Sequence, residues 1–179
     1  MPEITPAMQE RLIKGMAYIE KTKVETPDGL ATLMTQSRDA FMAEVNGLSE
    51  AQMSWSPGEK QWSVKEVCLH VSNAIGLCDT LIQALTQGIE LEEAKDIKMG
   101  VLDPDPGSLD TIRANVLKAF DKAIQGADGL RGAPNMTAKS PHPLFGPLDC
   151  RQWSAFNILH ANVHVGQVRR VKGTAGFPA

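Results

Sequence analysis

The sequence predicts an all-α protein, an antiparallel four-helix bundle with an extra helix at its N-terminal end. Apolar side chains recur at three- and four-residue intervals in residues 28–47, 63–88, 108–126 and 149–172, the pattern of an amphipathic helix. Connectors rich in proline, glycine or charge separate these segments. Alternation with a period of two, which is typical of strands, is absent over any useful length. Four amphipathic helices can bury their apolar faces against each other as a bundle.

The extra helix is expected to begin at Thr5, because Thr5 and Pro6 are residue types of an N-cap and a first helical position. Its apolar face consists of Met8, Leu12, Met16 and Ile19. A polar connector follows it. We therefore expect one domain over residues 1–179, with the leading helix and connector in residues 1–25 and the bundle in residues 26–172.

Local signals place the next helices. The segment 28–47 has an apolar face, and Ser49 with Gln52 then forms a capping box for one short turn before a Pro-Gly break. Ser63 and Glu66 form a stronger capping box at the start of the next long helix. The apolar face of that helix includes Val64, Val67, Cys68, Val71, Ala74, Ile75, Cys78, Leu81, Ile82 and Leu85.

The last two helices are separated by a long loop. Ser108 is expected to cap a helix that ends near Gly126. Residues 128–148 are rich in proline and glycine, and so long a loop within a domain is usually functional or disordered. We expect His142, within this loop, to be solvated, although the loop has the length to cover a site. Asp149, with Gln152 three residues later, is expected to cap the final helix.

Composition limits the classes of function. The 179 residues include 18 basic and 21 acidic side chains and give a net charge of −3, so no basic stripe for nucleic acid is expected. The three cysteines lack paired spacing, which is typical of reduced thiols. The N-terminus does not resemble a signal peptide, and no apolar run approaches the ~18 residues of a membrane span. A soluble, cytoplasmic protein without a membrane partner is expected.

Two histidines lie within the apolar stripe of the final segment. His160 and His164 are four residues apart, so both imidazoles should point inward, one above the other. A metal ion would need another ligand from elsewhere, and His70 lies at the edge of the stripe in residues 63–88. Neutral imidazole suits zinc, nickel, iron or copper, and three histidines leave positions free for water and substrate. The alternative is that each histidine is a hydrogen-bonded core residue.

Two familiar metal sites are excluded by the neighbouring residues. Zinc proteases place a glutamate directly after the first histidine of HExxH, and Ala161 occupies that position here. Di-iron bundles require glutamates in the core together with a Glu-x-x-His pattern, which is absent from the sequence.

The segments SVKEVCLHV (63–71) and HANVHVGQV (160–168), each in a long helix, together resemble the DinB/YfiT-like superfamily. The resemblance covers roughly residues 26–172. It implies a four-helix bundle with a divalent metal ion on His70, His160 and His164, often in a homodimer. Characterised relatives include transferases and isomerases that use low-molecular-weight thiols. This sequence has Ala161, Asn162 and Val163 between the last two ligands, where an acidic residue and a further histidine are frequent in the family.

Two functions therefore remain open. The first is a metal-dependent transferase or isomerase that joins an external small thiol to a small electrophilic substrate. The second is a non-catalytic, dimeric stress or interaction protein whose histidines only fill the core. A bundle that carries a small apolar ligand is a further alternative.

Several side chains near the histidines have alternative roles. Glu66, Asn157 and Gln167 are candidates to orient the ligand histidines, although Glu66 is also needed for its capping box. Trp62 and Trp153 are expected to pack in the core or at the end of the bundle. Cys150 is expected to be structural, although a helix N-terminus can lower the pKa of a thiol.

Overall fold

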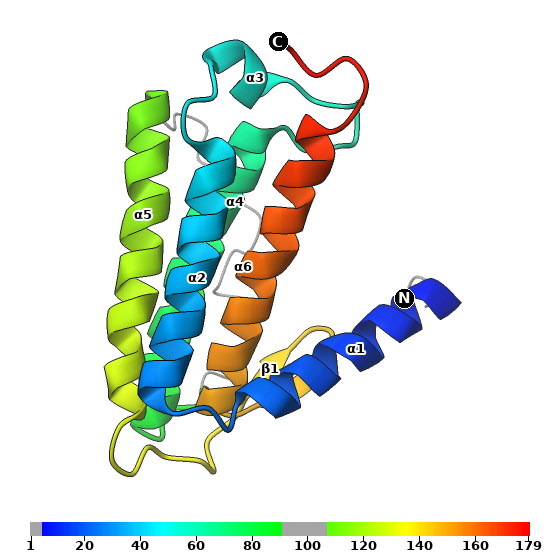
Figure 1. Ribbon diagram of the computed structural model, residues 1–179. Coiled ribbons are helices and arrows are strands. Elements are labelled where there is room, and N and C mark those ends of the chain that lie inside the picture. The colour runs from blue at the N-terminus through cyan, green and yellow to red at the C-terminus, as the bar shows by residue number, and fades with distance from the viewer. Residues whose placement is uncertain (1–4, 91–106) are drawn as a thin grey trace.

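The computed structural model describes residues 5–90 and 107–179, and most of them are helical. The helices are α1 (Pro6–Thr22), α2 (Pro27–Val45), α3 (Glu50–Ser54), α4 (Val64–Thr86), α5 (Leu109–Gly126) and α6 (Cys150–Lys172), with a 3-10 turn, η1 (Ala127–Leu130). Four of them, α2, α4, α5 and α6, form the bundle, and α1 leans against its side (Figure 1). The predicted all-α four-helix bundle with an extra N-terminal helix is confirmed, but its helices are not antiparallel throughout, because α4 and α5 run in the same direction.

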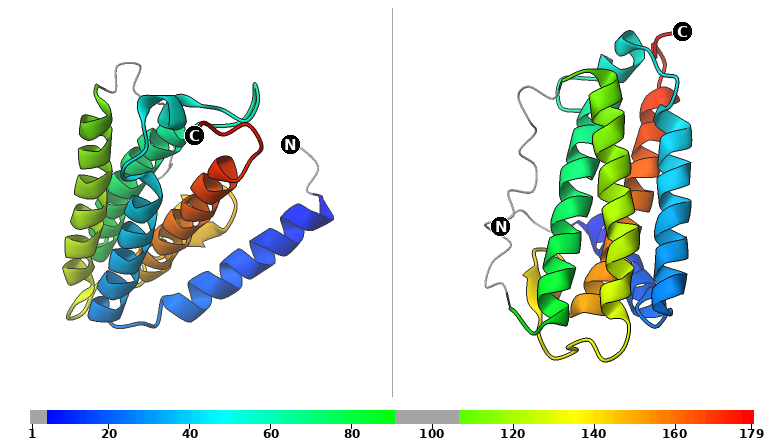
Figure 2. Two further views of the ribbon diagram at one scale, coloured as in Figure 1. Left: turned by 45° about the horizontal axis from the view of Figure 1, so that its top comes forward. Right: turned by 90° about the vertical axis from the view of Figure 1, so that its left-hand side faces the viewer.

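Helix packing defines a square arrangement. Both α2 and α4 pack against α5 and against α6, so α5 and α6 lie at opposite corners (Figure 2). His70 of α4 lies beside His160 of α6, and Ile75, further along α4, lies beside Asn157, which comes earlier in α6. The two helices therefore run in opposite directions. Lys122 of α5 meets Asp79 of α4 and Gln83 meets Gly126, so α4 and α5 run in the same direction. The end of α4 and the start of α5 therefore lie at opposite ends of the bundle.

The helices begin where the capping residues predict. The Ser63 hydroxyl accepts a hydrogen bond from the Glu66 amide, and the Glu66 carboxylate accepts one from the Ser63 amide. Asp149 and Gln152 make the same reciprocal pair at the start of α6. These two boxes fix the first turns of the helices that carry the three histidines.

The loop after α5 contains structure that the sequence pattern did not predict. Strands β1 (Ser140–His142) and β2 (Gly146–Leu148) form a two-stranded antiparallel hairpin in which Ser140 pairs with Leu148. Strands of three residues are too short to show a period of two. Gly146 has φ +73°, a conformation that favours glycine and allows the tight turn between the strands.

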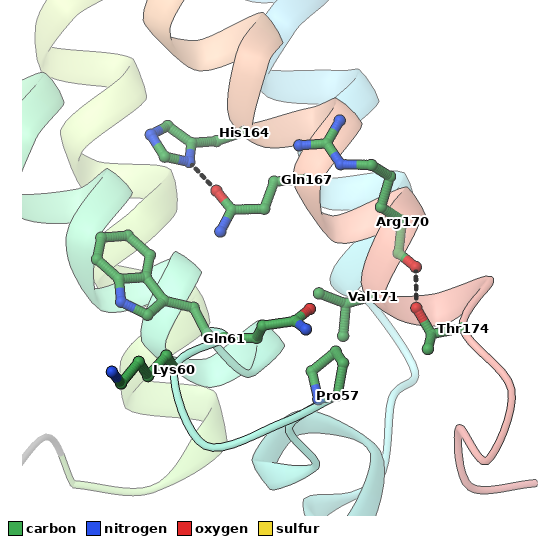
Figure 3. Close-up of a pocket in the computed structure, with 9 residues that line it drawn as sticks. Pro57, Lys60, Gln61, His164, Gln167, Arg170, Val171 and Thr174 are labelled. Carbon is green, nitrogen blue, oxygen red and sulfur yellow. Dashed lines mark hydrogen bonds between the residues drawn. The ribbon is translucent and has the colours of Figure 1, made fainter. Parts of the chain in front are cut away.

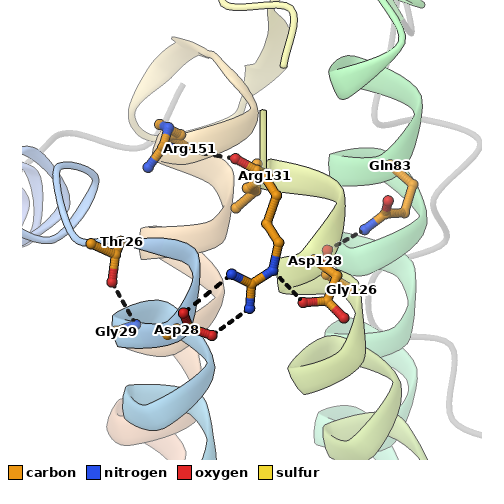
Figure 4. Close-up of polar contacts among 9 residues, drawn as sticks. Thr26, Asp28, Gly29, Gln83, Gly126, Asp128, Arg131 and Arg151 are labelled. Carbon is orange, nitrogen blue, oxygen red and sulfur yellow. Dashed lines mark hydrogen bonds and ion pairs between the residues drawn. The ribbon is translucent and has the colours of Figure 1, made fainter. Parts of the chain in front are cut away.

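Ion pairs attach the loop to the base of the bundle (Figure 4). The Arg131 guanidinium donates to the carboxylates of Asp28 in α2 and Asp128 in η1. Gln83 donates to the Gly126 carbonyl at 2.7 Å, which links α4 to the end of α5. The loop is thereby held across the ends of three bundle helices.

The most apolar bundle helix is α4, and its apolar stretch is largely buried. Among the helices in the described ranges, α4 alone is long and apolar enough to cross a membrane by length and composition. More than half of its apolar window is buried, as expected for a helix in the centre of a core.

Candidate metal centre

Three histidines from two helices meet inside the bundle. His70 comes from α4, and His160 and His164 come from successive turns of α6. The Nε2 atom of His160 lies 3.1 Å from Nε2 of His70 and 2.9 Å from Nε2 of His164. The predicted convergence of these three side chains is therefore present in the structure.

The spacing of the nitrogens fits a common metal ion. One ligand atom from each histidine lies within 4.8 Å of the others. Two nitrogens that are each about 2.1 Å from an ion lie roughly 3.0 Å apart at a right angle and roughly 3.4 Å apart at the tetrahedral angle. The observed distances of 2.9 and 3.1 Å fall at the right-angled end of this range.

Gln167 holds one imidazole in the form that a ligand requires. Its Oε1 atom lies 2.8 Å from Nδ1 of His164. Because a carbonyl oxygen only accepts, this hydrogen bond places a proton on Nδ1 and leaves the Nε2 lone pair free. Gln167 thus makes the contact expected of a residue that orients a ligand histidine.

His160 lies between the other two histidines and has one nitrogen without a partner. Its ring stacks on Phe156, with centroids 5.6 Å apart and planes 17° apart. Its Nδ1 atom is buried and has no hydrogen-bond partner among the described residues. A buried polar atom without a partner costs free energy, and the other nitrogen of this ring, Nε2, is the one that faces His70 and His164.

Burial favours the neutral form of all three imidazoles. Burial lowers the pKa of His70. Burial, together with the neighbouring His164 and His70, lowers the pKa of His160 well below its usual range. Burial and the charge of His70 lower the pKa of His164 to about 4. Neutral imidazoles present the lone pairs that metal ions need.

Trp62, the residue before the α4 cap, forms an aromatic wall beside the cluster. Its ring centroid lies 4.9 Å from that of His70 and 6.4 Å from that of His164, on which it stacks with planes 11° apart. The expectation for Trp62 was packing in the core or at the end of the bundle, rather than a place in the wall of a substrate site. Trp153 does pack in the core, where its indole N–H donates to the Ser140 carbonyl at 3.1 Å.

Two of the candidate orienting residues are engaged elsewhere. Glu66 Oε2 accepts hydrogen bonds from the amide and the hydroxyl of Ser63 at 2.7 and 2.8 Å. The Asn157 amide donates to the Ile75 carbonyl at 3.4 Å, and the residue lines a small cavity that also includes Asp79. The hydrogen bonds in the described part of the chain therefore connect Gln167, but neither Glu66 nor Asn157, to the cluster.

His142 is buried, which corrects the expectation that it is solvated. Its Nδ1 atom accepts hydrogen bonds from the amides of Leu144 and Phe145 at 3.1 and 3.2 Å. The ring packs on Phe156 with centroids 4.3 Å apart. Burial lowers the pKa of His142 to about 4. The side chain is a structural part of the hairpin turn.

The cysteines do not supply a reactive thiolate. All three are buried. Burial raises the pKa of Cys68 and Cys78 to about 12 and also raises the pKa of Cys150, despite the position of Cys150 at the start of α6. The alternative that the helix terminus activates Cys150 is therefore wrong.

Two cavities of opposite character border the cluster. A polar cavity of about 620 Å³ reaches His164. A second groove of about 550 Å³ lies between α1, the hairpin and α6, and it includes His142 and His160. Its apolar walls come from Leu12, Leu144, Phe145, Phe156, Leu159 and Val163.

Six of the nine residues that line the first cavity have polar side chains (Figure 3). Besides His164, these are Lys60, Gln61, Gln167, Arg170 and Thr174. Trp62, Val171 and Pro57 complete the walls. The loop before α4 and the last two turns of α6 therefore build this cavity together.

Known proteins share this architecture. A family model described as the DinB superfamily matches residues 33–168. The chain is 23% identical over 163 residues to the uncharacterized protein YuaE of Bacillus subtilis (strain 168), covering 79% of this chain and 96% of YuaE. The crystal structure of TT2238, a four-helix bundle protein, matches with a TM-score of 0.61 and 21% sequence identity over 81% of this chain and 99% of that chain. The family match, which spans most of the bundle, confirms the resemblance, and this chain belongs to the DinB superfamily.

Proposed function

We propose that this protein binds a divalent metal ion through His70, His160 and His164 and acts on a small molecule as a thiol-dependent transferase or isomerase. The observation that carries the proposal is the meeting of three imidazole nitrogens from two helices within about one ion's reach. When bound, a divalent ion lowers the pKa of a thiol or water ligand and so supplies a nucleophile near neutral pH. Zinc, nickel and iron are the candidate ions.

The surrounding residues would prepare the site for such chemistry. Gln167 keeps the Nε2 lone pair of His164 available by accepting the Nδ1 proton. Trp62 packs beside His70 and His164 and shields that side of the cluster from water. Polar interactions are stronger where water is excluded.

An external thiol fits the state of the chain's own cysteines. Their burial and raised pKa values leave no internal thiolate at neutral pH in the described residues. In a transfer, the thiol sulfur would form a bond to an electrophilic carbon while the leaving group departs with the electron pair of its bond. The thiol proton and the leaving group would then be released together as the second product.

Metal titration of untagged protein tests the binding step. We expect zinc or nickel to bind to one site, as measured by calorimetry. The variants His70→Ala, His160→Ala and His164→Ala should each weaken the affinity by more than the ~10–100-fold loss that is typical when a hydrogen-bond partner of a metal ligand is removed. His142→Asn is the matched control, because His142 is the one remaining histidine and lies outside the cluster. Its affinity should equal that of the wild type.

The alternative function gives a different result. If the wild type binds no divalent ion, or if the three alanine variants bind as tightly as the wild type, the histidines are core residues of a non-catalytic bundle. Incubating the protein with added ion and panels of electrophiles and small thiols would then show no metal-dependent product.

A further inference from the structure

The polar cavity beside His164 has an unusual charge composition. Two cationic side chains, Lys60 and Arg170, line it together with the amides of Gln61 and Gln167. None of the described residues that line it is acidic. In a chain with 21 acidic and 18 basic residues, this local balance favours a negatively charged occupant.

The two cations are not used to hold the fold together. Arg169 and Lys172, on the same stretch of α6, pair with Glu44 at 2.7 and 2.8 Å. The side chains of Arg170 and Lys60 make no ion pair or hydrogen bond with any residue in the ranges 5–90 and 107–179. Their charge therefore remains available to a ligand.

The Arg170 side chain extends back along α6 towards the turn that follows His164. Its Nη1 atom lies 3.5 Å from the position that a Cβ atom on Gly166 would take, which places the group over the turn of helix that follows His164. Figure 3 shows the guanidinium turned towards Gln167 and His164. Lys60 comes from the loop before α4, on another wall of the cavity.

Guanidinium groups bind carboxylates with two parallel hydrogen bonds, which fixes orientation as well as position. A ligand held in this way at Arg170 would extend past Gln167 to the histidines. The cavity, of about 620 Å³, is large enough for a small organic acid.

We propose that this cavity binds the carboxylate of a small acidic thiol or substrate, with Arg170 as the anchor and Lys60 as a second positive charge. The reacting end of that ligand would lie at the three histidines, a part of the proposal that rests on the proposed function. The carboxylate site itself depends only on Arg170, Lys60 and the cavity.

Three thiols of similar size and different charge test the proposal on cobalt(II)-loaded protein. The probes are 3-mercaptopropionate, 2-mercaptoethanol and cysteamine, and the readout is the thiolate-to-cobalt absorption band. We expect Arg170→Gln to weaken binding of 3-mercaptopropionate at least about tenfold, the worth of one charge-assisted contact. The same substitution should leave the affinity for 2-mercaptoethanol unchanged and should not weaken the affinity for cysteamine. Comparing variant with wild type for each thiol cancels their intrinsic differences.

Lys118→Gln is the matched control. It removes the same charge from an exposed position on α5, a helix at the opposite corner of the bundle from α6. Its affinities for all three thiols should equal those of the wild type. If Arg170→Gln behaves like Lys118→Gln, the carboxylate site is refuted while the metal and thiol chemistry stands.

A second titration needs neither metal nor thiol. Glutarate is added to metal-free protein, and the fluorescence of Trp62 is identified by its loss in Trp62→Phe. We expect a saturable change in the Trp62 fluorescence. The affinity for glutarate derived from it should fall at high salt and should be at least about tenfold lower in Arg170→Gln. If this change occurs but no thiol gives a cobalt band, the thiol reaction fails and the anion site stands. No change in the wild type overturns the anion site.

Discussion

Burial controls the chemistry of the histidine side chains. His160 and His164 are neutral because the bundle excludes water from them. The hydrogen bond with Gln167 fixes the tautomer of His164. A solvent-exposed pair at the same spacing would be partly protonated near pH 6.5. The apolar stripe around the pair is therefore part of the site.

The protonation of His142 gives a prediction for stability. Its pKa is about 4 in the folded protein and about 6.5 when unfolded, so the unfolded state binds more protons between these values. The stabilising contribution is complete above pH 6.5 and is lost as the pH falls towards 4. His142→Asn keeps an acceptor for the Leu144 and Phe145 amides but cannot titrate.

We therefore expect the free energy of unfolding to fall less in His142→Asn than in the wild type as the pH is lowered from 6.5 to 4. The difference between the two falls should be about 2 kcal/mol. Urea titrations of the metal-free wild type and variant across this range measure the difference. Parallel curves for the two proteins would show that His142 does not contribute.

Some site residues could be predicted from the sequence and others could not. Spacing within an apolar stripe identifies His160 and His164, and Gln167 follows one turn later on the same face. Trp62 and Arg170 could not be predicted, because each contributes through a cavity that exists only after the loop before α4 folds against α6. The burial of His142 depends in the same way on the hairpin.

Helices and connectors differ in how strongly the sequence specifies them. The caps at Ser63, Ser108 and Asp149 were predictable because a cap depends on residues only three positions apart. The parallel direction of α4 and α5 was not predictable. Short loops force neighbouring helices to be antiparallel, whereas a link as long as that between Thr86 and Leu109 permits either direction.

Docking of α1 depends on a close approach at one glycine. A Cβ atom at Gly15 would lie 2.8 Å from Cζ of Phe145 and 3.6 Å from Cδ2 of Leu159. We expect Gly15→Val to force these side chains apart, to cost roughly 1–3 kcal/mol and to speed amide hydrogen exchange in residues 6–22. Exchange in α4 should not change.

Gly76→Ala is the control for this substitution. Gly76 lies within α4, and a Cβ atom there would meet nothing within 4 Å. Alanine should therefore stabilise the protein by roughly 0.5–1 kcal/mol, the usual gain within a helix. If Gly15→Val leaves exchange in α1 unchanged, the contact with Phe145 does not hold that helix in place.

At the scale of the molecule, the histidine cluster links two bundle helices, so a bound ion should stabilise the fold. A ligand that binds only the folded state at 100 times its Kd adds about 2.7 kcal/mol. We expect a higher Tm with zinc or nickel in excess, and a smaller rise for His160→Ala, which keeps only two of the three ligands. Calorimetric scans with and without the ion make this test, and an equal shift in His160→Ala would point to binding elsewhere.

The predicted homodimer also concerns the whole molecule. Ile13, Leu144 and Val163 are exposed by 64%, 53% and 53%, and the latter two line the apolar groove. Burial of such side chains favours association. Light scattering coupled to gel filtration should give twice the mass of one chain, and Val163→Glu should shift the mass towards one chain. A wild-type mass of one chain would contradict the prediction.

X-ray absorption at the metal edge of untagged, loaded protein tests the central claim most directly. Three convergent histidines predict about three imidazole nitrogens near 2.1 Å from the ion, with one imidazole fewer in His160→Ala. A spectrum without imidazole scattering, or one that His160→Ala does not alter, would contradict the proposed site.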